Sequence, residues 1–324
     1  MIKIDLITGF LGSGKTTFIK KYARYLIGKG QKIGILVNDY GAVNVDTMLL
    51  SELEGDNCGI ESVAGACDRD CHQRRFKTKL IALAMSGYDR VLIEPSGVFD
   101  VDEFFDSLYE EPLDRWYQIG SVIAVADVNL STELSKSAEY LLASQACVAG
   151  RLVLSKTQLT NEAAAQKTTA LINAVLQNFG SRRRFDEKSV TAKDWDKLTD
   201  SDYEEIENCG YFSPDFTKLE TTDDSGFKSL YFMELSLSPE QLEQRVKALF
   251  ETDGAGGIFR AKGFVNDSGK WLELNAVRGS ITLSPIDNGQ NIVIVIGENL
   301  NKDKITEILC AELHVRLSRL KRIV

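Results

Sequence analysis

A glycine-rich segment close to the start of the chain constrains the fold more than any other feature. Gly9 to Thr16 reads G-F-L-G-S-G-K-T, which fits the pattern G-x-x-x-x-G-K-[ST]. The β-branched run Ile2–Ile7 before it predicts a buried strand, and Lys15–Ile27 after it predicts a helix. A strand, a glycine-rich turn and a helix in this order predict a loop whose backbone amides bind phosphate groups.

The residue types in this loop indicate individual roles. Its glycines can adopt the dihedral angles that turn successive N–H groups inward. Lys15 is expected to reach the β- and γ-phosphates and to be catalytic, and the Thr16 hydroxyl is expected to ligate Mg²⁺. The residues predicted to bind the nucleotide here are Gly9, Gly12, Ser13, Gly14, Lys15, Thr16 and Thr17.

Short apolar runs alternate with helical stretches over the first 180 residues. Runs that are apolar throughout fit strands buried on both faces of a parallel sheet. The further predicted strands are Ile33–Val37, Val91–Ile93, Val122–Val125 and Leu152–Leu154, and the further helices are Cys71–Met85, Ser135–Ser144 and Asn161–Gln177. The alternation predicts an α/β fold, with the doubly wound, mostly parallel sheet of a P-loop NTPase.

The pattern changes after residue 180. Residues 181–227 are charged and turn-rich and are predicted to connect two domains, a nucleotide-binding domain at 1–180 and a smaller α+β domain at 228–324. The last domain is expected to hold a mostly antiparallel sheet with helices on one face. Its predicted strands are Ser229–Leu237, Ile258–Val265, Trp271–Val277, Ser280–Ser284 and Ile292–Ile296, and its predicted helices are Pro239–Phe250 and Asn301–Leu317.

Polar segments follow three of the predicted strands, where ligands of open α/β sheets bind. These segments are Asn38–Gly41, Glu94–Gly97 and Ser155–Gln158. Asp39 and Glu94 are candidates to bind Mg²⁺ directly or through water, and Glu94 is also a candidate catalytic residue. The backbone N–H of Gly97 is a candidate sensor of the γ-phosphate.

Composition and charge exclude several classes of protein. With 44% hydrophobic and 26% charged residues, the chain has enough apolar material for a core. Its formal charge of −9 argues against a dedicated nucleic-acid-binding protein. No apolar run reaches the roughly 20 residues that a membrane span needs, and the N-terminus lacks a signal-peptide pattern. We therefore expect a cytoplasmic protein whose six cysteines are thiols.

Together these motifs resemble the CobW/UreG/HypB-like P-loop GTPases, a family of metallochaperones and metal-centre maturation factors. The resemblance is strongest to the CobW-type branch. Gly9–Thr17 matches its GFLGxGKTT segment, and Asn38–Asp46 resembles its NEFGExxxD stretch. Glu94–Gly97 resembles its ETTG or ESSG element, Arg260–Phe264 matches its RAKGF segment, and Ile296–Leu300 fits its last strand and helix start. The resemblance therefore spans both domains.

The base-reading segment departs from the family pattern. The family reads guanine with N-K-x-D, and this chain has Ser155-Lys156-Thr157-Gln158. Ser155 and Lys156 remain candidates to bind the nucleotide, since the stem of Lys156 can pack along the base. Gln158 carries a donor as well as an acceptor and cannot offer guanine the paired acceptors of a carboxylate. The resemblance favours GTP, and ATP remains open.

The cysteine motif also departs from the family. CobW-type proteins carry Cys-x-Cys-Cys, and this chain has Cys67 and Cys71 in a C-x-x-x-C arrangement followed by His72. Thiolates suit Zn²⁺ or another transition metal, and the two cysteines would share a face of a helix that began at Cys67. The family's neighbouring glutamate is Ala42 here. The remaining candidates for a purely structural role are Cys147, Cys209 and Cys310.

Two functional readings remain open. In the first, Mg²⁺ and GTP, or ATP, gate a metallochaperone or metal-centre maturation factor that hydrolyses the γ-phosphate. Its partners would be a purine nucleoside triphosphate and a client metalloprotein, with a homodimer as one form and neither nucleic acid nor membrane. In the second, the nucleotide switch activates a partner enzyme without delivering metal, and Cys67 and Cys71 are incidental. A small-molecule kinase is disfavoured because no substrate-lid segment is evident.

Overall fold

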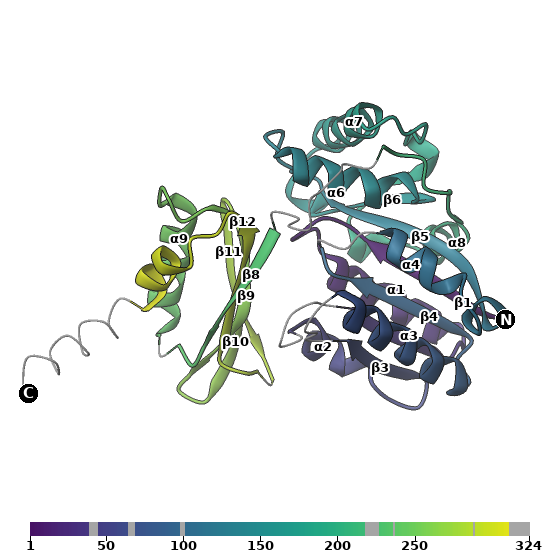
Figure 1. Ribbon diagram of the computed structural model, residues 1–324, viewed down its shortest axis with the longest axis horizontal. Helices are drawn as coiled ribbons and strands as arrows, with labels where there is room; N and C mark the ends of the chain where they lie inside the picture. Colours follow the sequence, from purple (N-terminus) through teal and green to yellow (C-terminus); the bar gives the residue numbers. More distant parts are fainter. Residues whose placement is uncertain are drawn as a thin grey trace, which may run out of the picture. The chain divides into compact units, whose positions relative to one another are not determined.

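The chain forms two compact units, Met1–Glu220 and Thr221–Val324, in this computed structural model (Figure 1). The structure describes residues 1–38, 45–63, 69–97, 101–217, 227–235, 237–287 and 289–310. Each unit has a sheet of its own, of seven strands in the first unit and five in the second. The two sheets differ in strand direction, so each unit is described by itself.

The first unit holds a parallel sheet in the order β3-β2-β4-β1-β5-β6-β7. Its strands are β1 (Ile2–Thr8), β2 (Ile33–Asn38), β3 (Cys58–Val63), β4 (Arg90–Pro95), β5 (Tyr117–Asp127), β6 (Arg151–Ser155) and β7 (Val190–Thr191). Its helices are α1 (Lys15–Gly28), α2 (Val45–Leu50), α3 (Arg69–Met85), α4 (Val101–Leu108), α5 (Leu113–Trp116), α6 (Lys136–Cys147), α7 (Glu162–Asn178) and α8 (Asp200–Glu207), and its 3-10 helices are η1 (Ser51–Leu53), η2 (Thr157–Leu159), η3 (Glu187–Ser189) and η4 (Trp195–Lys197). The predicted α/β fold is confirmed.

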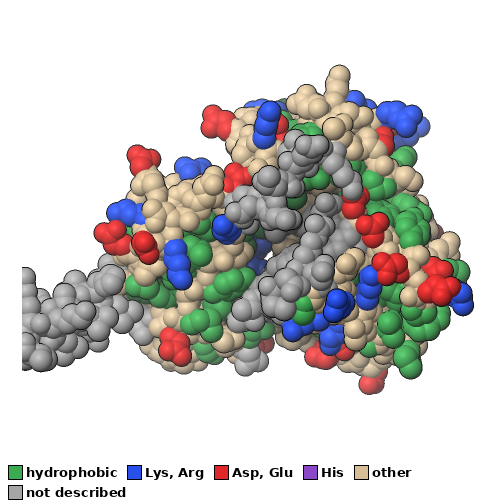
Figure 2. Space-filling view, in the orientation of Figure 1, with side chains coloured by type: hydrophobic (Ala, Val, Ile, Leu, Met, Phe, Trp, Pro, Cys, Tyr) green, Lys and Arg blue, Asp and Glu red, His purple; other side chains and the backbone are tan. Residues whose placement is uncertain are grey.

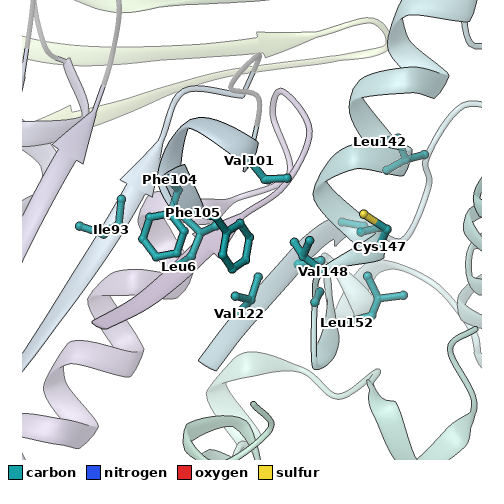
Figure 3. Close-up of a cluster of buried hydrophobic side chains, with 14 of the residues drawn as sticks. Leu6, Ile93, Val101, Phe104, Phe105, Val122, Leu142, Cys147, Val148 and Leu152 are labelled. Carbon is teal, nitrogen blue, oxygen red and sulfur yellow. The ribbon is translucent and has the colours of Figure 1, made fainter. Parts of the chain in front are cut away.

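Both faces of this sheet are buried, which explains the uninterrupted apolar strands. Leu36 packs into a core with α3, α4, α6 and α7, whereas its neighbours Ile35 and Val37 pack into a second core with α1, α2 and α8. Figure 3 shows part of the first core, where Leu6, Ile93 and Phe104 meet. Because successive side chains of a strand point to opposite faces, each apolar run serves both cores.

Two strands were missed by sequence pattern, and both lie at the edges of the sheet. β3 contains Gly59, Glu61 and Ser62 among its six residues, so it does not form a continuous apolar run. β7 has only two residues, Val190 and Thr191, paired with Leu152 and Val153 of β6. Edge strands bury less apolar surface than central ones, so their composition carries a weaker signal.

Residues 181–217, predicted to connect the domains, pack in the first unit. β7 extends the sheet, and Tyr203 and Ile206 of α8 enter the second core. Residues after 217 up to 226 lie outside the described part of the chain. The apolar pattern of the sequence predicted the central strands of the first unit. It did not predict that residues 181–217 pack against them, because that depends on tertiary contacts of β7 and α8.

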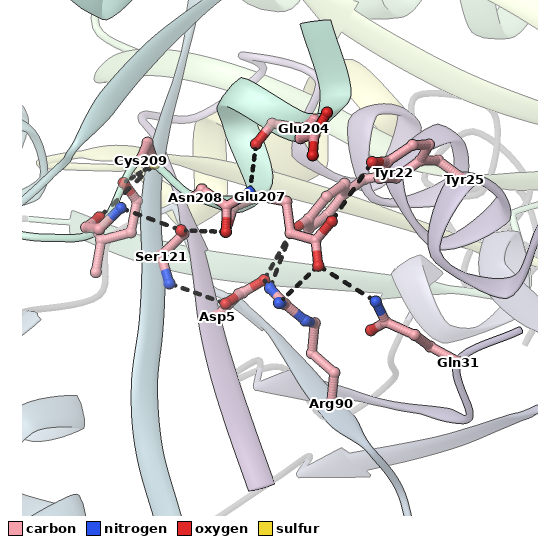
Figure 4. Close-up of polar contacts among 12 residues, drawn as sticks. Asp5, Tyr22, Tyr25, Gln31, Arg90, Ser121, Glu204, Glu207, Asn208 and Cys209 are labelled. Atoms are coloured by element: carbon pink, nitrogen blue, oxygen red, sulfur yellow. Dashed lines mark hydrogen bonds and ion pairs between the residues drawn. The ribbon is translucent and has the colours of Figure 1, made fainter. Parts of the chain in front are cut away.

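A buried network of charged groups fixes α8 to the sheet (Figure 4). Arg90 in β4 is 1% exposed and pairs with Asp5 in β1 at 2.6 Å and with Glu207 in α8 at 2.9 Å. The Tyr22 hydroxyl donates to Asp5 at 2.8 Å, and the backbone N–H of Ser121 donates to the same carboxylate at 2.9 Å. The network therefore joins three strands, α1 and α8.

The second unit is an antiparallel sheet in the order β11-β10-β9-β12-β8. Its strands are β8 (Phe227–Met233), β9 (Gly257–Asp267), β10 (Lys270–Val277), β11 (Ser280–Ile286) and β12 (Ile292–Glu298), and its helices are α9 (Pro239–Glu251) and residues 302–310. Both helices pack on a core that includes Val246, Ile305 and Val295. This architecture confirms the predicted α+β class.

The segment Arg260–Phe264 lies in β9, between β10 and β12. Gly263 is required there because a Cβ atom would overlap the carbonyl oxygen of Ile292. The described part of the predicted helix Asn301–Leu317 is helical from 302 to 310, and residues 311–324 lie outside the description. None of the helices in the described ranges combines the length and the apolar character that crossing a bilayer requires.

Candidate nucleotide and metal site

The glycine-rich loop joins the end of β1 to the start of α1. Gly9, Gly12 and Gly14 have φ angles of 150°, 75° and 94°, a region that favours glycine. A Cβ atom at Gly9 would overlap the carbonyl oxygen of Val125 in β5, so the loop runs directly against the sheet. The predicted strand, turn and helix therefore come together as the motif requires.

The start of α1 is left uncapped. Gly14 supplies no side-chain cap, and the first turn contains no acidic residue. The first N–H groups of a helix have no partners within the helix, and they carry the positive end of its dipole. An uncapped start next to a glycine loop is suited to bind an anion.

Lys15 lies folded over this loop. Its ammonium group donates to the carbonyl oxygen of Gly9 at 2.8 Å, and the residue is 6% exposed. Ser13 is also buried, and Thr17 is exposed at the start of the helix. The loop thus holds a buried cation against the Gly9 carbonyl, beside the N–H groups at the start of the helix.

Two carboxylates converge on the Thr16 hydroxyl. Thr16 Oγ1 donates to Glu94 Oε1 at 2.6 Å, and Asp46 Oδ1 lies 3.4 Å from the same hydroxyl. A hydroxyl and two carboxylates are hard oxygen donors, the ligand type that Mg²⁺ prefers. The donor set therefore fits Mg²⁺, with Glu94 and Thr16 among the predicted ligands.

Asp46 was not singled out as a site residue, and Asp39 lies outside the described residues. Asp46 stands in the first turn of α2 and is largely buried. The signal that would have found it is its position as the final aspartate of the stretch that resembles NEFGExxxD. Tertiary contact with Thr16, 30 residues away, is what distinguishes it from an ordinary helix-start aspartate.

Gly97 lies against the glycine-rich loop, just after β4. A Cβ atom built on it would lie 2.6 Å from Leu11 Cδ2 and 3.1 Å from Leu11 Cα, so Gly97 approaches the loop closely. The carbonyl oxygen of Gly97 accepts a hydrogen bond from the buried side chain of Gln145 in α6 at 3.1 Å. The structure thus places the candidate γ-phosphate sensor beside the loop, with a positioning contact that the sequence did not reveal.

The Ser155–Gln158 segment also reaches this edge of the sheet. Ser155 ends β6, and its Cβ atom lies 3.6 Å from the point where a Gly14 Cβ would stand. Lys156 has a φ of 59° and its ammonium pairs with Asp127 at 2.5 Å. Gln158 is exposed in η2. Ser155 therefore lies next to the phosphate loop, and Lys156 follows it with its ammonium group paired to Asp127.

The candidate transition-metal site is only partly described. Cys67 lies outside the described residues, and α3 begins at Arg69. Cys71 is half-buried and lines a pocket of about 360 Å³ beside Arg74, Arg75 and Lys79. His72, the next residue, is fully buried. The ranges that the structure describes contain no group of three His, Cys, Asp or Glu side chains that could hold a metal ion.

The other cysteines have the properties of structural thiols. Burial raises the pKa of Cys58 to about 11, of Cys147 to about 12 and of Cys209 to about 11. Burial also raises the pKa of Cys310 above its ordinary value. The thiolate is the form that binds metals and attacks electrophiles, so these shifts disfavour both roles.

The fold and the loop define a P-loop nucleotide-binding protein. Residues 3–180 match the family described as CobW/HypB/UreG, nucleotide-binding domain, and residues 231–313 match the cobalamin synthesis protein CobW C-terminal domain. The chain therefore belongs to the CobW/HypB/UreG family and carries the C-terminal domain of CobW.

Curated relatives match over part of their length. Zinc chaperone YeiR of Escherichia coli is 28% identical over 184 residues, which is 56% of this chain and 54% of that protein. Zinc chaperone YjiA of the same organism is 29% identical over 169 residues, 50% of this chain and 51% of that protein. The chain spans about half the length of these relatives. The solved structure of Zn(II)-bound YjiA GTPase from E. coli has 19% identity and a TM-score of 0.35, covering 96% of this chain and 98% of that one.

Proposed function

We propose that this protein is a nucleotide-dependent metallochaperone or metal-centre maturation factor, in which GTP binding and hydrolysis of the γ-phosphate gate the binding of metal or client. The observation that carries the proposal is the convergence of Thr16, Glu94 and Asp46 beside the glycine-rich loop. The relatives named as zinc chaperones support the metal part of the proposal. Its partners are a purine nucleoside triphosphate and a client metalloprotein.

The loop and helix residues hold the polyphosphate. The N–H groups at the start of α1 donate to phosphate oxygens, and Lys15 exchanges its hydrogen bond to the Gly9 carbonyl for the β- and γ-phosphates. Thr16, Glu94 and Asp46 would hold Mg²⁺, which neutralises charge on the transferring phosphoryl group. The Gly97 N–H donates to the γ-phosphate, and Gln145 anchors the same residue through its carbonyl oxygen. Loss of the γ-phosphate releases Gly97.

Metal cargo and nucleotide are coupled through the first unit. Cys71 lies at the start of α3, which packs against β3 and contributes Phe76 and Leu80 to the same core as Ile93 of β4. β4 leads into the Glu94–Gly97 segment. The Cys71 region and the γ-phosphate site therefore both border the core that α3 and β4 share. If nucleotide changes the affinity for Zn²⁺, then Zn²⁺ changes the affinity for nucleotide by the same factor.

A calorimetric titration tests the coupling. Zn²⁺ is titrated into the protein alone and into the protein with Mg²⁺ and a non-hydrolysable GTP analogue. We expect the Kd for Zn²⁺ to change by roughly five-fold or more, the lower end of typical allosteric couplings. The Cys67→Ser/Cys71→Ser variant should lose Zn²⁺ binding and keep nucleotide binding, while Cys310→Ser serves as the control thiol. Identical Zn²⁺ curves with and without nucleotide would reject the proposal.

A second function is favoured by the sparse ligand set around Cys71. Ala42 stands where the family has a glutamate, and the described residues offer no three-ligand metal group. In this alternative the protein is an ATP- or GTP-dependent switch that activates a partner enzyme without delivering metal. The Cys67→Ser/Cys71→Ser variant distinguishes the two, because client activation survives the change only in the alternative.

A further inference from the structure

An aromatic side chain lies where the glycine-rich loop meets the Ser155–Gln158 segment. Trp195 opens η4 after β7, the strand beside β6, so it follows the same edge of the parallel sheet as Ser155. Its ring atoms Cη2 and Cζ3 lie 3.2 and 3.6 Å from the point where a Gly14 Cβ would stand, and Ser155 Cβ lies 3.6 Å from that point. The indole, the phosphate loop and the base-reading segment therefore meet at one place.

The small residues around the indole make room for it. Gly14 has no side chain and Ser155 has only a hydroxymethyl group, so the six-membered edge of the indole packs directly against the loop. A Cβ atom at Gly14 would press on the ring, and its φ of 94° already disfavours other residues. The ring is thus held within van der Waals distance of the loop that binds the phosphates.

The loop that carries Trp195 is held in position by contacts with α1. The indole meets the Phe18 ring edge-on with centroids 5.5 Å apart. Asp196 pairs with Lys21 at 2.5 Å, and the Asp194 carboxylate accepts from the Asp196 N–H at 3.1 Å. Trp195 therefore keeps its place without a ligand, so little conformational entropy is lost when a base packs on it.

The indole N–H group of Trp195 is a hydrogen-bond donor buried within the fold. Its Nε1 atom is buried and has no hydrogen-bond partner among the residues that the structure describes, although the side chain is partly exposed. The N–H bond lies in the plane of the indole and its nitrogen is shielded from solvent, so a base stacked on the ring does not accept from it. What a base can contact is the partly exposed ring, which lies beside Gly14 and Ser155.

The Ser155–Gln158 segment has no carboxylate that could select guanine. Gln158 is neutral and exposed, and the ammonium group of Lys156 is paired with Asp127. Stacking on an aromatic ring tolerates any base, because every base has a π-face. An aromatic surface therefore suits a site in which a carboxylate no longer selects guanine.

We propose that Trp195 forms the aromatic wall of the base subsite and binds the purine ring of GTP and ATP to the same extent. The inference rests on the proposed function and deepens it, since it names how the base is held. Trp195 strengthens binding of purine nucleotides, and discrimination between guanine and adenine depends on other residues.

Calorimetry on the full chain tests this with three ligands, Mg–GTP, Mg–ATP and inorganic tripolyphosphate with Mg²⁺. Trp195→Ala should raise the Kd for both nucleotides by about tenfold and leave their ratio and the tripolyphosphate Kd unchanged. Trp195→Phe should retain most of the nucleotide affinity. Trp116→Phe, an exposed tryptophan on α5, is the matched control and should change nothing.

Trp195→Ala losing tripolyphosphate and nucleotide affinity equally, or losing neither, would overturn the inference. If Trp195→Ala does not fold, the Trp116→Phe/Trp271→Phe variant decides, since it leaves Trp195 as the only one of three tryptophans. Its fluorescence should change with GTP and ATP and not with tripolyphosphate, and an unchanged signal with all three overturns the inference. Folded wild-type protein that binds tripolyphosphate but neither nucleotide would reject the proposed function itself.

Discussion

Two buried cations of the first unit, Lys15 and Arg90, lie in contrasting environments. Lys15 stands at the start of α1, where it donates to the backbone carbonyl of Gly9 at 2.8 Å. Arg90 lies among the strands, where two carboxylates accept from it at 2.6 and 2.9 Å. The bond of Lys15 to a neutral oxygen can be exchanged for phosphate, whereas moving Arg90 would strand two buried carboxylates. One cation is thus suited to binding and the other to holding the fold.

The strongest test of this contrast removes the Arg90 charge. Arg90→Met leaves the carboxylate of Asp5 buried without its guanidinium, so we expect a loss of about 3–5 kcal/mol in the free energy of unfolding. Urea unfolding followed by circular dichroism measures it. The control is Arg24→Met, which breaks an exposed ion pair with Glu52 and should cost less than about 1 kcal/mol. Equal small losses in both variants would contradict the assignment.

Removing the other cation should affect binding and not stability. Lys15→Ala deletes a charge-assisted hydrogen bond to phosphate, so Mg–GTP affinity should fall by about 1.5–3 kcal/mol, or roughly ten- to 150-fold in Kd. Unfolding free energy should change far less than in Arg90→Met. Isothermal titration and urea unfolding of the same preparation separate the two effects. Lys20→Ala, on the same helix, is the control, and affinity equal to wild type in Lys15→Ala would sink the phosphate assignment.

A third variant sharpens the comparison at the base end of the site. Gln158→Asp restores paired carboxylate acceptors for the guanine edge, so the affinity for GTP relative to ATP should rise by about tenfold. Competition binding of the two nucleotides measures the ratio. Gln158→Asn keeps a neutral amide and should leave the ratio as in wild type. An unchanged ratio in Gln158→Asp would show that this segment does not contact the base.

The smallest effect is expected at the exposed start of α8, the helix that carries Glu207 into the buried network. Hydrogen bonds from Lys193 and from the Thr199 backbone lower the pKa of Asp202 to about 2. A depressed pKa stabilises the fold above the unfolded value near 3.8, and this contribution is lost as pH falls through about 2.

Asp202→Asn should therefore cost about 0.5–1 kcal/mol at pH 7, as expected for a capping interaction, and the difference from wild type should vanish near pH 2. Urea unfolding at several pH values checks this. Glu204→Gln, on the exposed surface of the same helix, is the control. A difference that stays constant between pH 7 and pH 2 would mean that the Asp202 carboxylate is not the group that titrates.

Charge on the surface contrasts with both buried cations. Figure 2 shows acidic and basic side chains interspersed with apolar ones over the face of the first unit. The exposed ion pairs include Lys79 with Glu61 at 2.6 Å and Lys20 with Glu52 at 3.2 Å. Solvent screens such pairs, so they contribute little to the fold. Lys15 differs from these surface charges because it is buried and lies next to the glycine-rich loop.

Sequence alone was enough to locate the phosphate loop and the central strands. The loop depends on three glycines and Lys15 within eight residues, and local backbone geometry largely determines what such a segment does. β3 and β7 were not found, and α8 was expected only as local helix in a connecting stretch, because these polar or short segments have no periodic apolar pattern. Asp46 and Gln145 were missed because each acts through a partner far away along the chain, at Thr16 and Gly97.

The sequence by itself determined the phosphate-binding loop, the α/β class of the first unit and the strands of the second, because these depend on short-range patterns of glycine and apolar residues. Only the tertiary structure brought Glu207 to Arg90, 117 residues apart, and placed Trp195 against Gly14. Burial made those contacts decisive. A charge removed from water must find its partner in space, and an indole ring must find a surface to pack on. Both are set by the packing of whole elements and not by neighbouring residues.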